Sequence, residues 1–163
     1  MLPAERPGVD PKGRGSVVLD DISRSLIEML QRNGRQSYAS MAAAVGLSEP
    51  AVRQRVQRLI DAQVIQIVAV TDPAQVGFRR QAMIGVRVDG DPTGPVSDLD
   101  ALPEIEYVVI TAGSFDLLLE VVCEDDEHLL DLIRRIRRLP GVTSTESFLY
   151  LKLHRQRYDW GTR

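Results

Sequence analysis

The sequence predicts an α+β chain in two parts: three short helices, followed by a half in which strands and helices alternate. Three observations support this division. Apolar residues recur at helical spacing between residues 19 and 62, and Gly46 interrupts the pattern once. Apolar and β-branched runs separated by Gly and Pro occupy residues 81–163. Between the two patterns lies the segment 72–80, which contains Pro and Gly and is expected to be a hinge or linker.

The first helix is expected from about Asp20 to Gln31. It follows an arm, residues 1–18, that is rich in Pro, Gly and charge and that we expect to be disordered or loosely packed. Asp20 or Asp21 would cap the helix, because an aspartate side chain accepts from free N–H groups at a helix start. The stripe expected to pack against the next helices comprises Ile22, Leu26, Met29 and Leu30.

Residues 38–65 predict two helices joined by a tight turn. Ser37 is placed to cap the first, and Gly46 ends it, because glycine tolerates the left-handed backbone conformation that closes many helices. Ser48 is placed to cap the second, with Pro50 in its first turn, where no N–H is needed. This is the layout of a helix-turn-helix, whose second helix can enter the major groove of DNA.

The second helix of the pair divides into a buried stripe and an exposed face. The buried stripe comprises Val52, Val56, Leu59 and Ile60. At about 100° per residue, glutamines lie near the centre of the exposed face and can reach base edges, while arginines on its shoulders can meet phosphates. The predicted DNA-binding residues are Ser48, Ala51, Arg53, Gln54, Arg55, Gln57 and Arg58. A solvated amphipathic helix is the alternative that the wheel alone leaves open.

The run VIQIVAVTD follows this helix and is rich in β-branched residues. It is expected to form a wing strand. Residues 19–71 are therefore predicted to be a winged helix-turn-helix domain.

The second half predicts six elements in the order βαββαβ. They are the strand Gln81–Val88, the helix Val96–Leu102, the strands Ile105–Ala112 and Leu117–Cys123, the helix Asp126–Leu139 and the strand Thr143–Leu153. This order predicts a ferredoxin-like domain over residues 81–163, with both helices on one face of an antiparallel sheet. Because the strands are apolar at nearly every position, we expect the other face to pair with a second copy, which would make the protein an obligate dimer.

Composition limits the function. Residues 1–71 hold nine Lys and Arg against seven Asp and Glu, a net charge of +2, whereas residues 72–163 hold eleven against sixteen, a net charge of −5. The positive charge lies in the part with the helix pair, as a DNA-binding head requires. No apolar run approaches the roughly 20 residues that span a bilayer, and the first residues lack the apolar centre of a signal peptide, so a cytoplasmic location is expected.

No cofactor or metal site is expected. Cys123 is the only cysteine and lies in an apolar run, which is typical of a small buried side chain. His128 and His154 show no metal-ligand spacing. The sequence also holds no nucleophile elbow, phosphate-binding loop or paired acid and base, so we do not expect an enzyme.

Four segments resemble, in the same order, the Lrp/AsnC family of feast/famine regulators. They are LDDISRSLIEMLQRNGR, AAAVGLSEPAVRQRVQRLIDAQVI, GSFDLLLEV and RRLPGVTSTESFLYLK. The resemblance covers nearly the whole chain from Leu19 onward. It implies a transcriptional regulator whose C-terminal domain, of the RAM type, dimerises and assembles into octamers or higher rings. It also implies a small effector, typically an amino acid, held between dimers.

The same resemblance assigns an effector site to the turn Gly113, Ser114, Phe115 and Asp116, together with Thr145 and Ser147 on the last strand. In such a turn the free N–H groups could hold a carboxylate and Asp116 an ammonium. An ordinary hairpin turn, in which Asp116 caps local N–H groups, is the alternative. Many relatives have an aromatic residue directly after the Asp, whereas this chain has Leu117, so the family's usual effector does not transfer directly.

The leading hypothesis is a sequence-specific regulator that places paired recognition helices on half-sites roughly 10 bp apart or a multiple of it on double-stranded DNA. One rival is a ferredoxin-like catalyst with an accessory helical domain. The other is a metabolite-binding assembly module whose helical head contacts protein. The arginines of RRIRR, residues 134–138, oppose the negative end of the last helix, and contact with wrapped DNA or a neighbouring dimer is the alternative for them.

Overall fold

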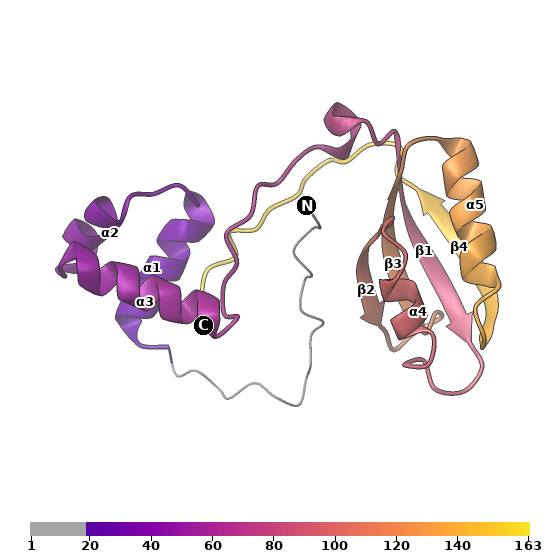
Figure 1. The fold of residues 1–163 in the computed structure, drawn as a ribbon, viewed down its shortest axis with the longest axis horizontal. Helices are drawn as coiled ribbons and strands as arrows, with labels where there is room; N and C mark the ends of the chain where they lie inside the picture. Colours follow the sequence, from indigo (N-terminus) through magenta and orange to yellow (C-terminus); the bar gives the residue numbers. More distant parts are fainter. Residues whose placement is uncertain (1–18) are drawn as a thin grey trace. The chain divides into compact units, whose positions relative to one another are not determined.

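The computed structural model describes residues 19–163, so the expected arm, residues 1–18, lies outside the described residues. The chain divides into two compact units (Figure 1). Unit 1 contains the residues up to Ala69 together with Gln156–Arg163, and unit 2 contains Val70–Arg155. The C-terminal segment, which we expected to belong to the second domain, is therefore part of the first.

Unit 1 is built from three helices, α1 (Asp21–Arg32), α2 (Tyr38–Val45) and α3 (Glu49–Asp61). Their apolar stripes meet in one core. Its buried members are Leu26, Met41, Ala42, Val52 and Val56, and Ile22, Met29, Leu30 and Ile60 pack against them partly buried. Because each helix is too short to be stable alone in water, this shared core holds the unit together.

The helix ends follow the predicted capping residues, with one exception. The side chain of Asp20 accepts from Ser23 N at 2.8 Å, and that of Ser37 accepts from Ser40 N at 3.2 Å. Gly46 has φ 70° and ψ 30°, the left-handed conformation that closes α2. Ser48 occupies the N-cap position of α3, but its side chain makes no capping hydrogen bond.

The predicted wing strand is wrong. Residues 65–72 are not in a strand, and Val68 and Val70 are 70% and 61% exposed. A strand needs a second strand to accept and donate its backbone hydrogen bonds, and none pairs with this run in the described part of the chain. High β-propensity alone did not make it a strand.

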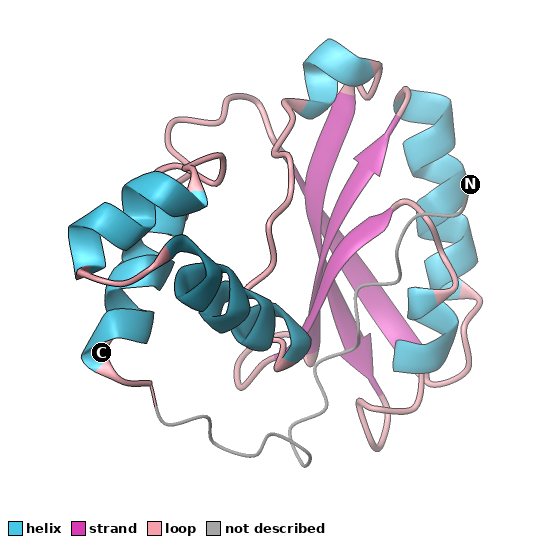
Figure 2. Ribbon diagram, turned by 60° about the vertical axis from the view of Figure 1, so that its left-hand side comes forward, coloured by secondary structure: helices cyan, strands magenta, loops and turns pink. Residues whose placement is uncertain are grey.

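Unit 2 confirms the βαββαβ order. It contains β1 (Arg80–Val88), α4 (Val96–Asp100), β2 (Ile105–Ile110), β3 (Leu117–Cys123), α5 (Asp126–Arg137) and β4 (Val142–Leu149), after a short 3-10 turn at Pro73–Val76. The sheet has the strand order β2-β3-β1-β4, and all its pairs are antiparallel. In Figure 2 all the strands belong to this unit, whereas unit 1 is helical. The fold is therefore α+β and ferredoxin-like.

The last strand ends earlier than expected, at Leu149 rather than Leu153. Tyr150 N still donates to Gln81 O at 2.8 Å, but β1 begins at Arg80. The register of the two strands ends at the pair Ala82–Leu149, and Leu151, which would lie opposite Arg80, is 93% exposed.

The core of unit 2 lies between one face of the sheet and the two helices. Ile84, Val86 and Leu119 from the strands meet Leu99 of α4 and Leu132 of α5, and all are fully buried. We call the opposite face, which neither α4 nor α5 covers, the open face. Alternate residues of each strand, such as Met83 and Gly85 on β1, point to it because strand side chains alternate between faces.

The buried carboxylate of Glu104, just before β2, binds two side chains of α5. Glu104, which is 8% exposed, accepts from Arg135 at 2.6 and 3.3 Å and lies 3.0 Å from His128 Nε2. Burial opposes ionisation of Glu104, but the hydrogen bonds from Arg135 and His128 outweigh it, so the pKa of the carboxyl is lowered. The carboxylate therefore stays charged beneath the helix.

The C-terminal segment of unit 1 docks on α1. Gly161 N donates to Gln31 Oε1 at 3.0 Å, and Thr162 Oγ1 donates to Glu28 Oε1 at 2.9 Å. Arg24 of the same helix donates to Arg163 O. These bonds tie the end of the chain to the first helix of the helix-turn-helix unit.

Candidate nucleic-acid interface and candidate effector turn

The exposed face of α3 is opposite its buried residues Val52, Val56 and Leu59. All the predicted DNA-binding residues lie outside that buried stripe: Ala51 and Arg55 are half-buried, and the others are exposed. The sequence therefore placed these side chains on the correct side of the helix. It did not foresee what each of them contacts.

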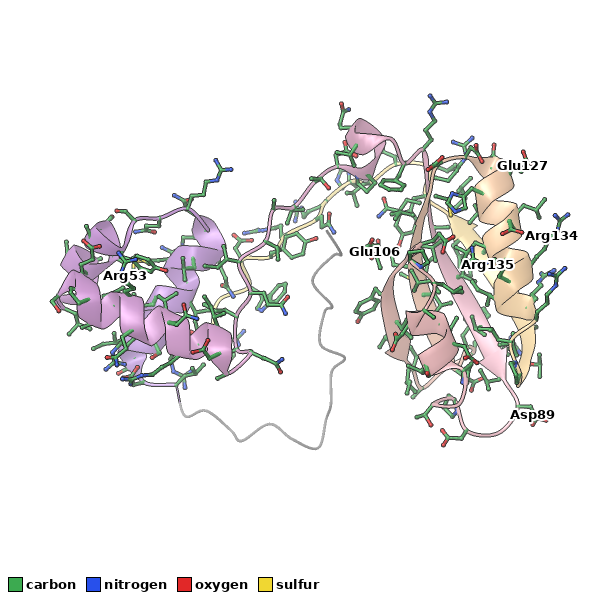
Figure 3. The ribbon with its side chains drawn as sticks, viewed as in Figure 1. Arg53, Asp89, Glu106, Glu127, Arg134 and Arg135 are labelled. Atoms are coloured by element: carbon green, nitrogen blue, oxygen red, sulfur yellow. The ribbon has the colours of Figure 1, made fainter. Side chains whose placement is uncertain are left out.

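Arg53, labelled in Figure 3, is held in place by two neighbours. Its Nη2 donates to Glu49 Oε1 at 2.9 Å, one turn earlier on α3, and its guanidinium lies 4.6 Å from the ring centroid of Tyr38 on α2. A guanidinium above an aromatic face is attracted by the ring's negative surface. Because the side chain of Arg53 is still 61% exposed, its cation remains accessible to an anion.

Arg55 is committed to an internal contact. Its Nη1 donates to Asp20 Oδ2 at 2.6 Å, while Asp20 Oδ1 caps α1. The hydrogen bonds from Ser23, with a further contribution from Arg55, lower the pKa of Asp20 to about 2. Asp20 thus both caps α1 and fixes the orientation of α3 against it. Spacing along the sequence gave no signal for this pair.

The polar side chains in the middle of α3 differ in their freedom. Gln57 Nε2 donates to Asp61 Oδ1 at 2.8 Å. By contrast, the side chains of Ser48, Gln54 and Arg58 make no hydrogen bond or ion pair with any residue from 19 to 163. Gln54 and Arg58 lie one turn apart on the exposed face and Ser48 lies at the start of the helix; we call these three unpaired side chains the free row.

The predicted effector turn joins β2 to β3. Gly113 and Ser114 are exposed, a Cβ at Gly113 would meet nothing within 4 Å, and the φ of Gly113 is not positive. Nothing within the chain therefore requires a glycine at this position. The turn itself is closed by Thr111, whose N–H donates to Asp116 O at 2.9 Å and whose hydroxyl donates to Phe115 O at 2.6 Å.

Asp116 has a structural partner. Its Oδ2 accepts from Val88 N at 2.8 Å, and its own N–H donates to Val86 O at 3.0 Å. Because β3 begins at Leu117 opposite Val86, the N–H of Val88 lies beyond the end of that strand, and the carboxylate satisfies it. Asp116 thus caps a local N–H group, as in the ordinary hairpin turn considered above, through one of its two carboxylate oxygens.

Phe115 folds back over the open face. Its ring lies so close to Gly85 that a Cβ there would be 2.6 Å from Phe115 Cγ. Phe148 of β4 meets the ring edge to face, with centroids 6.1 Å apart, and the Arg87 guanidinium lies 5.5 Å from its centroid. Gly85, Arg87 and Phe148 were absent from the sequence-based site, since only the strand register brings them to Phe115.

Thr145 and Ser147 point to the other side of the sheet. They pair with Val86 and Ile84, which face the helix layer, and Arg137 Nε of α5 donates to Thr145 Oγ1 at 2.8 Å. A groove of about 330 Å³ beside Thr145 is lined by Arg137, Val142, Thr143, Ser144 and Thr145. Within one chain the structure therefore does not bring Thr145 and Ser147 together with Phe115.

Other chemistry is not evident in the described residues. No group of three or more His, Cys, Asp or Glu side chains among them could hold a metal ion. Cys123 is buried, and burial, with a smaller contribution from Glu104, raises the pKa of its thiol to about 11, as expected for an inert side chain. No helix between residues 19 and 163 is long and apolar enough to cross a membrane.

A helix-turn-helix unit followed in the sequence by a ferredoxin-like unit is the arrangement of a class of DNA-binding regulators with a separate second domain. The AsnC-type helix-turn-helix domain family matches residues 19–60, and the Lrp/AsnC ligand binding domain family matches residues 81–160. The chain belongs to the Lrp/AsnC family and is a transcriptional regulator of that type.

Similar proteins agree with this assignment. The HTH-type transcriptional regulator FL11 of Pyrococcus horikoshii is 30% identical over 86% of this chain and 94% of its own. The structure of E. coli AsnC, 26% identical, superposes with a TM-score of 0.75 over 86% of this chain and 97% of that one. The feast or famine regulatory protein of M. tuberculosis complexed with L-methionine, 31% identical, gives 0.77 over 85% and 95%. These relatives are transcriptional regulators or regulatory proteins.

Proposed function

We propose that the protein reads specific DNA sequences through the free row of α3 and responds to an amino acid bound at unit 2. The free row is the observation that supports sequence-specific DNA binding. An exposed glutamine and arginine without a partner among the described residues lie opposite the buried stripe of α3, and an exposed serine without one lies at the start of the helix. Glutamine can bond bidentately to adenine and arginine to guanine, so such side chains in a major groove discriminate between bases.

The internal contacts of α3 divide the DNA-binding residues by role. Arg53 is oriented by Glu49 and Tyr38 but remains exposed, which suits a phosphate contact beside the free row. Arg55 serves the DNA indirectly, because its pair with Asp20 sets the angle at which α3 projects from the unit. Gln57, bonded to Asp61, and the small Ala51 complete the surface.

The experiment is a DNA-binding titration with genomic fragments at several salt concentrations. Gln54→Ala and Arg58→Ala should each reduce the preference for the enriched sequence by about 1–3 kcal/mol while binding to random DNA changes less. Arg53→Ala should weaken binding to all sequences and reduce the salt slope by about one unit. Arg32→Ala removes an exposed arginine of α1 whose ion pair among residues 19–163 is with Glu28, and is the matched control. Equal preference in Gln54→Ala, Arg58→Ala and the wild type would contradict the proposal.

The effector part rests on the turn Gly113–Asp116. Gly113 is exposed and conformationally unconstrained, so its missing side chain leaves open space over the free N–H groups of the turn. L-Methionine is the first probe, because a relative's structure holds it. Gly113→Val should leave the melting temperature unchanged and abolish the heat of L-methionine binding in titration calorimetry. The control, Ser97→Val at an exposed position of α4, should change neither quantity. Undiminished binding to Gly113→Val would remove the turn from the site.

The open face supports self-association. Tyr107 and Phe148 are 51% and 45% exposed there, and they flank Met83, Leu118 and Val109 across the strands. Exposed aromatic and aliphatic side chains gathered on one sheet face are typical of an interface, and a second copy offers the same face in return. Dimerisation through it would place two free rows on one DNA, with higher assembly as the resemblance implies. Phe148→Glu should give a monomer by light scattering, and a dimer of unchanged mass would refute this face.

A further inference from the structure

The outward face of α5 carries an ordered charge pattern that the proposed function does not use. Opposite the buried Leu132 and Ile136, the helix presents an acidic first half and a basic second half. The exposed residues of this face are Glu127, Leu130, Asp131, Arg134 and Arg138. At about 100° per residue the four charged ones fall within one narrow stripe, with Leu130 at its edge.

These charges are not satisfied inside the chain. Glu127, Arg134 and Arg138 make no ion pair with any described residue, and Asp131 reaches Arg135 only at 3.9 Å while remaining 61% exposed. Their neighbours, by contrast, are engaged. Arg135 bonds Glu104 beneath the helix, and Figure 3 shows it directed toward the sheet while Arg134 points away.

We infer that this face of α5 is a self-complementary surface that binds the same face of a second copy, with the two helices antiparallel. The pairs Glu127 with Arg138 and Asp131 with Arg134 have the same midpoint, between positions 132 and 133. A two-fold axis at that point sets each acid of one helix opposite a base of the other, so four complementary pairings form at once. Leu130, which is 47% exposed, lies beside the axis and is covered in the same contact.

The charge order favours a second copy over a nucleic acid. A phosphate backbone would be attracted by Arg134 and Arg138, but it would be repelled by Glu127 and Asp131 on the same stripe. A copy of this chain satisfies all four. The face also lies on the side of unit 2 opposite the open face, so both contacts can form in one assembly.

The contact is small. A helix of 12 residues is about 18 Å long, and two such helices bury less than a stable interface requires. It therefore joins chains that are already paired elsewhere, where the second contact benefits from a high effective concentration. Because its charges are exposed, the association should weaken as salt screens them.

The test is sedimentation velocity on the full chain with two reversed variants. Arg134→Glu with Arg138→Glu makes the stripe wholly acidic, and Glu127→Arg with Asp131→Arg makes it wholly basic. Each variant alone should lose the largest species seen for the wild type at low salt, and an equimolar mixture of the two should restore it. Lys152→Glu with Arg155→Glu, the same change of charge on exposed residues elsewhere in unit 2, is the control and should assemble as the wild type.

Reversed charges oppose the helix dipole, so circular dichroism must show that α5 is intact. The milder pair Arg134→Gln with Arg138→Gln removes two positive charges without placing acids at the C-terminal end of α5, and should show the same loss. Three outcomes would overturn the inference: full assembly of either reversed variant, a mixture that stays small, or a wild type that does not assemble further at any concentration. Unchanged assembly with weakened DNA binding in the acidic variant would assign the stripe to DNA instead. These readouts are independent of base preference at α3, so failure here leaves the proposed function standing.

Discussion

Gly85→Ala tests the packing of the effector turn on the sheet. The ring of Phe115 covers Gly85 so closely that an added Cβ would lie 2.6 Å from Cγ and 2.7 Å from each Cδ. Ordinary carbon contacts are about 3.5–4.0 Å, so the ring must retreat by roughly 1 Å or swing away. A retreat strains the hairpin that Thr111 closes, and a swing exposes the ring and breaks its contacts with Phe148 and Arg87.

The expected cost is about 1–3 kcal/mol, the usual range for overpacking a well-filled site. For a unit of this size, 1 kcal/mol corresponds to a shift of about 4–8 °C, so Gly85→Ala should melt roughly 10 °C lower by calorimetry. Amide hydrogen exchange should locate the loss at the turn and the adjoining ends of β2 and β3.

Two further variants distinguish packing from backbone effects. Gly113→Ala, in the same turn but with open space around it, should melt as the wild type. Phe115→Leu removes the ring, so Gly85→Ala should cost much less in that background, with a coupling of about 1 kcal/mol or more. An unaltered melting temperature for Gly85→Ala, or an equal loss in both backgrounds, would show that the ring does not rest on Gly85.

Three other predictions concern the charges and the chain end. Glu104→Gln should lose about 2 kcal/mol in urea denaturation, less than a fully buried pair because Arg135 is partly exposed. The lowered pKa of Glu104 adds stability that is present above its ordinary pKa of 4.5 and is lost as the pH falls through the folded value, so the variant's loss should shrink in acid. For Asp20 the folded pKa is about 2 and the ordinary value 3.8, so the wild type should lose stability between these pH values and Asp20→Asn should not show that step; an identical acid titration of both would refute the hydrogen bonds that Asp20 accepts from Ser23 and Arg55. Deletion of Gln156–Arg163 should speed amide exchange in α1 and leave that of β1 unchanged, and equal protection of α1 in both chains would refute its docking.

The elements that the sequence predicted correctly depend on local signals. Ser37 and Gly46 bound α2 because a cap and a left-handed residue act within one turn of backbone. The buried stripe of α3 and the order of the six elements in unit 2 follow from periodicity, which every turn or strand repeats. The effector role of the turn Gly113–Asp116 came from the family resemblance and stays a prediction.

What the sequence missed depends on partners far along the chain. The run at residues 65–72 has the composition of a strand, but no strand of the described chain pairs with it. Arg55 was expected to face DNA, but Asp20, at the start of another helix, holds it. No local sequence signal indicates why residue 85 is a glycine, because Gly85 and Phe115 meet only through the register of β1 with β3. Such facts are set by tertiary contacts that no window of sequence contains.

Because the C-terminal segment packs on α1, the two units are completed in a fixed order as the chain is synthesised. Unit 2 is a continuous stretch, Val70–Arg155, inserted between two pieces of unit 1. During synthesis from the N-terminus, the ferredoxin-like unit has all its residues while the helical unit still lacks the partners of Glu28 and Gln31. Unit 1, which contains the helix-turn-helix, is therefore completed after unit 2. A chain truncated before Gln156 would contain all of unit 2 but would lack the segment that docks on α1.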